Sequence, residues 1–189
     1  MLKYLHIFIF LLTHDLTELK QYWASDILKK DFCWIFLIKK YFRTSSNAKK
    51  FLFWWRLSNE MYKNGNNRQR SCSKKINTKL SRKYGCDIAL GATIGKRIYM
   101  PHCVGIVITK YAIIGDDFQI MQNVTIGQNK GSKNPFIIIG NNTKILTGSC
   151  IIGESLIIGD NVTIGAMSFI NKDIPSNCTV YTEKTNKII

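Results

Sequence analysis

The chain has 189 residues, 46% of them hydrophobic, and a formal net charge of +15 at pH 7. This length accommodates one good-sized domain or two small ones. The early apolar run from Leu5 to Leu12 is far shorter than the roughly 20 residues of a membrane-spanning helix, and no small-residue cleavage site follows it. No zinc-finger or RNA-binding signature is present, which argues against a nucleic-acid module.

The charge is concentrated in the first half of the chain. Residues 1–86 hold 18 Lys and Arg against 5 Asp and Glu, a net +13, whereas residues 87–189 hold 9 against 7, a net +2. We therefore place a boundary between a basic α-helical region, 1–86, and a second domain with a C-terminal tail, 87–189. The basic region is typical of a solvated, Lys-rich helical surface; contact with an anionic membrane surface and, less well supported, with nucleic acid are the alternatives.

Helices are predicted before the boundary. Apolar residues recur at three- and four-residue spacings from Leu16 to Phe42 and from Lys49 to Lys63, and a third helix is predicted over 71–83. Polar breaks separate them at 44–47 and 64–67. The four tryptophans are predicted to pack helices together; they are Trp23, Trp34, Trp54 and Trp55.

From residue 88 an aliphatic residue recurs every six positions, often followed by glycine. The clearest run is Ile152-Gly153, Ile158-Gly159, Ile164-Gly165 and Ile170-Asn171, and earlier corners are Ile94-Gly95, Met100, Ile106, Ile114-Gly115, Ile120 and Ile126-Gly127. This period fits a chain that turns a corner every six residues and points an aliphatic side chain inward at each corner. Three such faces make a coil of about 18 residues, and stacked coils make a parallel β-helix.

Two irregularities interrupt the repeat. Residues 128–135 are polar and are predicted to form a loop that leaves the coil after Gly127. Gly140 and Gly153 are 13 residues apart, one more than two steps, so we expect one extra residue to bulge out within Leu146 to Ile151.

The repeat contains a single histidine, His102, and Asp87 lies 15 residues before it. With about 18 residues per coil, Asp87 is expected one coil away and half a face sideways. A carboxylate that accepts from Nδ1–H leaves Nε2 free to act as a base toward a hydroxyl. On spacing alone, a solvated histidine in a turn is the better-supported interpretation. The neighbouring Cys103 invites an acyl-enzyme alternative, although a cysteine in such a turn is more often a small packing residue.

These residues carry a resemblance to a known family. Asp87-Ile88, Ile94-Gly95, His102, Gly105-Ile106-Val107-Ile108 and Gln122-Asn123-Val124-Thr125-Ile126-Gly127 resemble the core of serine acetyltransferases and of their relatives found with surface-polysaccharide biosynthesis. The resemblance covers roughly residues 85–175. It implies hexapeptide-repeat acyltransferases with a left-handed parallel β-helix, preceded by helices.

The resemblance also implies roles for individual residues. His102 becomes the general base and Asp87 the residue that orients it. Acetyl-CoA, the acyl donor, lies along the outside of the helix between adjacent subunits, where Ala166, Asn171 and Lys172 match contact positions and Asn141 matches less closely. The implied assembly is a homotrimer or a dimer of trimers, and no metal is expected.

Three positions depart from the family pattern. Pro101 stands where the family has an Asp, Lys130 and Lys133 replace an Arg-His pair after Gly127, and Thr182 to Thr185 replace a Gly-Asn-Pro-Ala stretch. The first two departures place free serine in doubt as acceptor, because lysine lacks the two-pronged grip of arginine on a carboxylate. The third places the adenine end of the cofactor site in doubt.

The sequence therefore predicts an acetyl-CoA-dependent O-acetyltransferase, with L-serine slightly favoured as acceptor. The alternatives are O-acetylation of a sugar hydroxyl, for which Asn123 and Gln128 can supply matching groups, and a non-catalytic trimeric scaffold. Six cysteines without a CxxC pair suggest free thiols in a reducing cytoplasm. A cytoplasmic protein is expected, with peripheral contact at an anionic inner-membrane surface as a further expectation.

Overall fold

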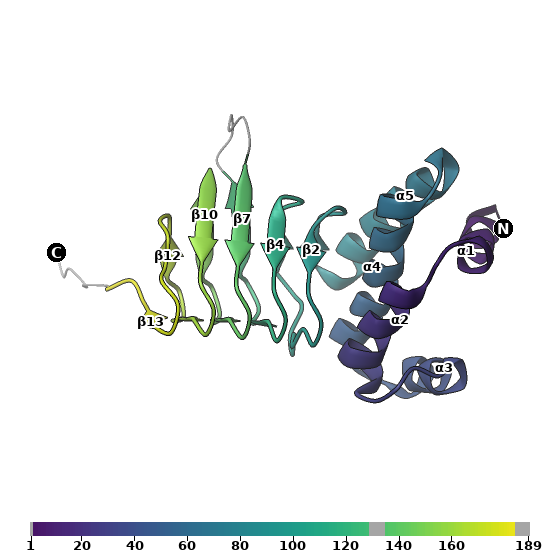
Figure 1. Ribbon diagram of the computed structural model, residues 1–189, viewed down its shortest axis with the longest axis horizontal. Helices are drawn as coiled ribbons and strands as arrows, with labels where there is room; N and C mark the ends of the chain where they lie inside the picture. Colours follow the sequence, from purple (N-terminus) through teal and green to yellow (C-terminus); the bar gives the residue numbers. More distant parts are fainter. Residues whose placement is uncertain (1, 129–134, 184–189) are drawn as a thin grey trace.

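The structure is a computed structural model and describes residues 2–128 and 135–183. Helices form one end of the elongated molecule and short stacked strands form the rest (Figure 1). The helices are α1 (Leu2–Thr13), α2 (Thr17–Trp23), the π-helical turn η1 (Ala24–Leu28), α3 (Trp34–Arg43), α4 (Asn47–Asn64) and α5 (Asn67–Tyr84). The strands are β1 (Asp87–Ile88), β2 (Thr93–Ile94), β3 (Val107–Ile108), β4 (Ala112–Ile114), β5 (Gln119–Ile120), β6 (Thr125–Gln128), β7 (Phe136–Ile139), β8 (Lys144–Ile145), β9 (Cys150–Gly153), β10 (Ser155–Ile158), β11 (Thr163–Ile164), β12 (Phe169–Ile170) and β13 (Thr179–Val180).

The helix boundaries follow local capping chemistry. The Ser46 side chain accepts from the Lys49 N–H at the start of α4, and Asn66 and Gln69 form a reciprocal capping box at the start of α5. Both expected polar breaks are thus confirmed. The stretch 16–42 is not one helix, however: it divides into α2, η1 and α3, because Lys29 adopts a left-handed conformation with φ 57° and ends η1.

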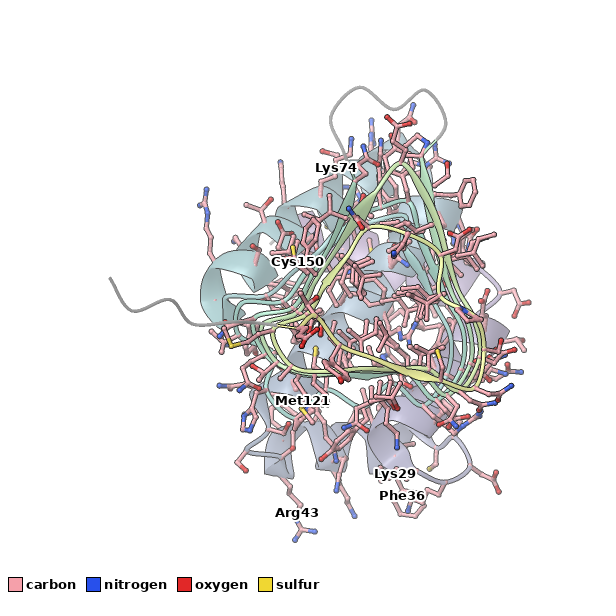
Figure 2. The ribbon with its side chains drawn as sticks, turned by 90° about the vertical axis from the view of Figure 1, so that its left-hand side faces the viewer. Lys29, Phe36, Arg43, Lys74, Met121 and Cys150 are labelled. Atoms are coloured by element: carbon pink, nitrogen blue, oxygen red, sulfur yellow. The ribbon has the colours of Figure 1, made fainter. Side chains whose placement is uncertain are left out.

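The strands form three parallel sheets, and consecutive strands generally belong to different sheets. Their orders are β1-β3-β6-β9-β12, β10-β7-β4-β2 and β13-β11-β8-β5. In the first sheet the register stacks Ile88, Ile108, Ile126, Ile151 and Ile170, all of them buried. Viewed along the long axis, the strands lie around a common interior (Figure 2). The six-residue pattern therefore marks the buried column of each sheet.

The number of residues per turn of the chain varies along the stack. Asp87 pairs with Val107, a repeat of 20 residues, whereas Val107 pairs with Thr125, a repeat of 18. The extra residue expected within Leu146 to Ile151 is placed wrongly: Ile145 and Ile151 keep the six-residue step, and the next buried corner, Ile158, follows after seven. The short link between β9 and β10 absorbs the insertion.

One corner of the stack is held by a ladder of polar side chains. Asn142 donates to Asn161 at 2.9 Å and Asn161 donates to Asn177 at 2.8 Å. All three residues have positive φ, between 51° and 63°. Asparagine tolerates this left-handed conformation because its short polar side chain bonds locally. The ladder joins successive exposed turns through side-chain hydrogen bonds, which aliphatic side chains could not make.

Helix α4 covers the end of the stack at its first turn. Trp55 is fully buried and donates from Nε1 to the Ile88 carbonyl at 3.0 Å, and Asn59 donates to the Ala92 carbonyl at 2.9 Å. Phe51 and Tyr84 join the same buried cluster as the aliphatic column. The helices and the repeat thus share one hydrophobic core at their junction, and α4 side chains partner carbonyls of the first turn.

The tryptophans divide into two groups. Trp23 and Trp55 are buried, and Trp54 is half-buried with Nε1 donating to the Tyr41 hydroxyl at 2.9 Å. Trp34 stacks edge-on against Trp23 yet remains 40% exposed. All four thus take part in packing, and Trp34 of α3 contacts Trp23 of α2 while part of its surface stays exposed. In the described part of the chain, no helix combines the length and apolar character needed to cross a membrane.

Candidate functional site

His102 lies in an exposed turn that is longer than its counterparts. Tyr99 bridges to Gln119, so Met100 corresponds to Ile120 in the next turn of the stack. From Met100 to the buried Ile108 the chain takes eight residues, whereas from Ile120 to Ile126 it takes six. The two additional residues fall in the segment that contains His102, and His102 is exposed.

Asp87 begins β1 and is also exposed. It heads the outward-facing column of the first sheet, opposite Val107, which lies five residues beyond His102. His102 is thus five residues out of register with Asp87, where an 18-residue coil predicts three, because this coil takes 20 residues. Within the described residues no hydrogen bond or ion pair joins Asp87 to His102, so an orienting contact between them stays a prediction.

Asn123 lies against the turn of His102. Its N–H donates to the Val104 carbonyl at 3.1 Å, and its side-chain oxygen sits over Gly105 so closely that a Cβ there would collide with it. Gly105 has φ 72° and donates from its N–H to the Gly85 carbonyl at 2.6 Å. The positive φ and the lack of space for a Cβ make glycine necessary at 105. The contact with Gly105 places Asn123, a predicted substrate residue, beside the His102 turn.

Gln128 ends β6 and pairs with Gly153 of β9. Its side-chain Oε1 is buried and has no hydrogen-bond partner among the described residues. A buried carbonyl without a donor costs free energy, on the order of 1–3 kcal/mol, so Gln128 offers an acceptor to a bound hydroxyl or ammonium group. The expected loop with Lys130 and Lys133 lies outside the described residues.

The positions matched to acetyl-CoA contacts lie at three different corners of the stack. Ala166 occupies the exposed turn between β11 and β12, and Asn171 and Lys172 follow β12, also exposed. Ala166 shares its corner with His102 and Asn123, because each lies in the turn that leads into the first sheet. One edge of the stack thus joins the predicted base to a predicted cofactor position.

Asn141 lies on another corner, between β7 and β8. Its Oδ1 accepts from the Asp116 N–H at 2.8 Å, and its N–H donates to Asp160 at 2.6 Å. These bonds give Asn141 a structural part in the stack. Its assignment to the cofactor stays a prediction, and the structure does not bring it to the edge of Ala166.

Electrostatics near the turn favour His102 over Cys103 as the reactive group. Burial raises the pKa of the Cys103 thiol, which keeps it protonated, and a thiol is a far weaker nucleophile than a thiolate. Burial also raises the pKa of Cys86 on the preceding turn. Neither cysteine has the electropositive surroundings of an activated nucleophile.

A cavity of about 520 Å³ opens beside the same turn, between the helices and the first coil. Lys29, Lys49 and Arg97 line it together with Met100 and Pro101. Burial, followed by the positive charges of Lys40 and Lys29, lowers the pKa of Lys49. Three cations and the buried carboxylate of Asp26, which is paired with Arg56, thus line the cavity, so its wall carries an excess of positive charge.

Sequence reasoning missed the residues that fix the first coil. The buried Arg56 of α4 pairs with Asp26 at 2.8 Å and donates to the carbonyls of Ile94 and Gly95 at 2.5 and 2.7 Å. Asp26 in turn accepts from the Ile98 N–H at 3.3 Å. These bonds hold the segment that leads into Met100 and the His102 turn. In the sequence, Arg56 looks like one more surface cation, so no signal identified it.

A second missed pattern was visible in the sequence. Acidic or amide residues recur directly after Gly115, Gly140 and Gly159, and they build the corner ladders.

Within the described residues, no group of three or more His, Cys, Asp or Glu side chains is placed to hold a metal ion.

Comparison with known proteins places these features in context. No family model matches the chain. It is 38% identical over 128 residues to a serine acetyltransferase of Staphylococcus epidermidis, covering 66% of this chain and 57% of that one. A serine acetyltransferase of Synechococcus elongatus is 39% identical over 99 residues, covering 51% of this chain and 39% of that one. The matched region thus covers just over half of the first relative and less than half of the second.

Solved structures give the same likeness at the level of the fold. Serine acetyltransferase isoform 3 of Entamoeba histolytica, in complex with cysteine, has a TM-score of 0.69 and 22% identity, covering all of this chain and 59% of that one. The soybean serine acetyltransferase complexed with serine has a TM-score of 0.64 and 24% identity, covering 69% and 53%. The resemblance to serine acetyltransferases indicated by the repeat residues is therefore confirmed.

Proposed function

We propose that this serine acetyltransferase-like chain is an acetyl-CoA-dependent O-acetyltransferase. The observation that carries the proposal is the placement of His102, the one histidine of the repeat, on an exposed turn lengthened by two residues. Asn123 and the corner that leads to Ala166 lie along the same edge of the stack. The curated relatives named serine acetyltransferase support the reaction class.

The proposed reaction is a direct transfer. His102 Nε2 takes the proton of the acceptor hydroxyl as that oxygen attacks the thioester carbonyl, the carbon–sulfur bond breaks, and the departing CoA thiolate receives a proton from the imidazolium. Asp87 orients His102 and stabilises its charge. No hydrogen bond joins the two side chains in the described part of the single chain. This role therefore requires that one of them changes its rotamer, or that Asp87 orients the His102 of a neighbouring subunit. A backbone N–H is proposed to stabilise the oxyanion.

The acyl donor fits the edge of the stack that carries Ala166. This corner presents Ala166 beside the exposed Met167, whose side chain lies over Gly148, and Lys172 beyond the far end of β12 supplies a positive charge suited to phosphate. Asn171 lies beside Lys172 and adds an amide. One of the similar solved structures is a serine acetyltransferase in complex with CoA, which agrees with this choice of donor.

L-Serine is the favoured acceptor, because the similar curated proteins carry that name. The cationic residues Lys29 and Lys49 of the cavity suit its carboxylate. Gln128 lies at the far end of β6 and does not line that cavity, so its unpartnered Oε1 is not assigned to the same bound serine. A sugar hydroxyl is the second candidate, since Asn123 and Gln128 match hydroxyls equally well. Both candidates use the same base.

Acceptor screening separates these functions. CoA release is measured with purified protein and acetyl-CoA, adding L-serine in one series and nucleotide sugars or short glycans in another. Saturable turnover with L-serine alone supports the serine function, and activity on a glycan alone supports the sugar function. Folded protein that binds acetyl-CoA but acetylates neither acceptor would leave a non-catalytic trimeric scaffold as the better description.

We further propose a basic helical region at 1–86, a left-handed parallel β-helix domain with a C-terminal tail at 87–189, and a homotrimer or dimer of trimers. The three parallel sheets and the similar solved structures support the architecture. Val104, Val107 and Phe169 are exposed on or beside the first sheet, and burying them between subunits would remove apolar surface from water. Light scattering tests the assembly: a monomeric mass at micromolar concentration would contradict it. A cytoplasmic location remains part of this proposal.

A further inference from the structure

Helix α1 is apolar on the face that it turns to solvent as well as on the face that it buries. Ile7 and Phe10 are buried against the other helices. On the opposite side the side chains of five residues are 38% to 68% exposed: Tyr4, Leu5, Phe8, Ile9 and Leu12. Residues 4–13 contain no Lys, Arg, Asp or Glu. A helix that is apolar all round is normally covered, so this outer face calls for a partner.

Helix α3 has a second exposed apolar stripe, and this one has basic flanks. Ile35, Ile38 and Phe42 recur at three- and four-residue spacings and are 62%, 53% and 78% exposed, while Leu37 on another side is fully buried. Lys39 and Arg43 stand beside the stripe. Figure 2 shows Phe36 and Arg43 projecting from the same side of the molecule, with Lys29 near them.

The two helices belong to one surface. Both lie at the end of the molecule opposite the last coils (Figure 1). A cavity of about 530 Å³ has Tyr4 of α1 and Tyr41 of α3 in its wall, together with the apolar Ile76 and Leu80. Its remaining lining includes four cations of α5: Lys75, Lys79, Arg82 and Lys83. An apolar hollow with a basic border is complementary to an amphiphile with an anionic head group.

Charge selects the occupant of this surface. Residues 1–86 carry a net +13, and of their five acids Asp26 and Glu60 are buried. A second copy docked through the same face would bring two strongly basic regions together, whereas an anionic lipid surface neutralises them. Apolar stripes with basic flanks are typical of helices that lie in the plane of a membrane interface.

We propose that the outer faces of α1 and α3 dock on an anionic phospholipid bilayer. The docked orientation places α1 and α3 in the head-group layer and directs the stacked coils away from it (Figure 1). The His102 edge then stays in water, open to its substrates. If three chains assemble with their coils side by side, three such surfaces face one bilayer and bind together.

Co-sedimentation tests the proposal with vesicles of phosphatidylcholine alone or mixed with phosphatidylserine. The full chain is expected to bind the mixed vesicles at low ionic strength, to bind less as salt is added, and to ignore phosphatidylcholine. Ile38→Ser with Phe42→Ser removes the apolar stripe and is expected to weaken binding about tenfold or more. Lys39→Glu with Arg43→Glu is expected to weaken binding about fivefold or more for each cation replaced.

The matched control is Lys110→Glu with Lys144→Glu, the same change of charge at exposed lysines of the repeat, and it is expected to retain wild-type binding. Circular dichroism confirms that each variant is folded, and the charge variant keeps the test decisive if the serine variant is not. Absence of binding to mixed vesicles overturns the proposal. An equal loss of vesicle binding in the control variant also overturns it. A lower molar mass of the α3 variants with unchanged vesicle binding overturns it as well, because the surface would then bind a second copy of the chain.

Discussion

The helical region and the repeat are stabilised in different ways, although they share a core at their junction. The repeat buries one aliphatic column per sheet and adds polar ladders at a corner, so each turn of the chain repeats the same local solution. The helical region depends on single side chains, such as the buried Arg56 and Trp55, that reach distant partners. It also leaves apolar faces of α1 and α3 uncovered.

This difference indicates where each kind of function is located. The repeat is nearly neutral and regular, and its candidate chemistry arises where the regularity fails, at the eight-residue step that carries His102. The helical region is strongly basic, and its candidate contacts are with surfaces. Four substitutions test this contrast, given from the largest expected effect to the smallest.

Replacing His102 with alanine should remove most turnover and leave the fold intact. The residue is exposed and makes no hydrogen bond within the described structure, so its loss removes chemistry rather than packing. Loss of a general base typically costs about 10²–10⁴-fold in rate. Steady-state kcat is the measurement, with Asp87→Asn expected to be milder if Asp87 only orients the imidazole. A kcat within tenfold of the wild type would refute the assignment.

Replacing Arg56 with methionine should destabilise the junction by about 3–5 kcal/mol, because Asp26 is left buried without its cation. Urea unfolding monitored by tryptophan fluorescence measures the loss. Arg97→Met is the matched control: its ion pairs with Asp116 and Asp117 are half exposed, so a loss of about 0–1 kcal/mol is expected. Equal losses in the two variants would show that α4 does not clamp the first coil.

Gly105→Ala tests the link between turn geometry and the site. A Cβ at this position collides with the Asn123 side-chain oxygen, and φ 72° strains an L-residue by about 1–2 kcal/mol. We expect lower stability together with lower kcat/KM, since the His102 turn must shift. Gly127→Ala is the control, because its Cβ would meet neighbours at an ordinary 3.7 Å or more. If both variants keep full activity, the turn does not position the base.

Asn161→Ala should have the smallest effect, about 1–2 kcal/mol of unfolding free energy. The substitution removes two ladder bonds and places alanine at φ 56°. Asn161→Gly relieves the backbone strain and leaves only the lost bonds, so it should fall between alanine and the wild type. Thermal unfolding of the three proteins gives the order of their stabilities. A glycine variant less stable than the alanine variant would contradict the role given to backbone strain.

The interior of the repeat was predictable because its signal is local. Ile88, Ile108 and Ile126 are buried in register as the six-residue step requires. Asp87 and His102 were identified from residue type and spacing. Their offset along the coil is five residues where three were expected, because two extra residues lengthen the coil. Asn123 and Gly105 are 18 residues apart, as stacked coils require, but their close contact also depends on left-handed backbone at both positions, which the repeat pattern does not show.

The sequence by itself determined the order of helices and repeat, the parallel stacking and the identity of the single repeat histidine, because each depends on a periodic pattern or on residue type. The tertiary structure decided which cations are buried, which helix caps the first coil and which apolar faces stay uncovered. Arg56 and Arg97 are the same residue type, but one is buried with Asp26 and the other is half exposed. Burial depends on long-range packing, and no local pattern encodes it.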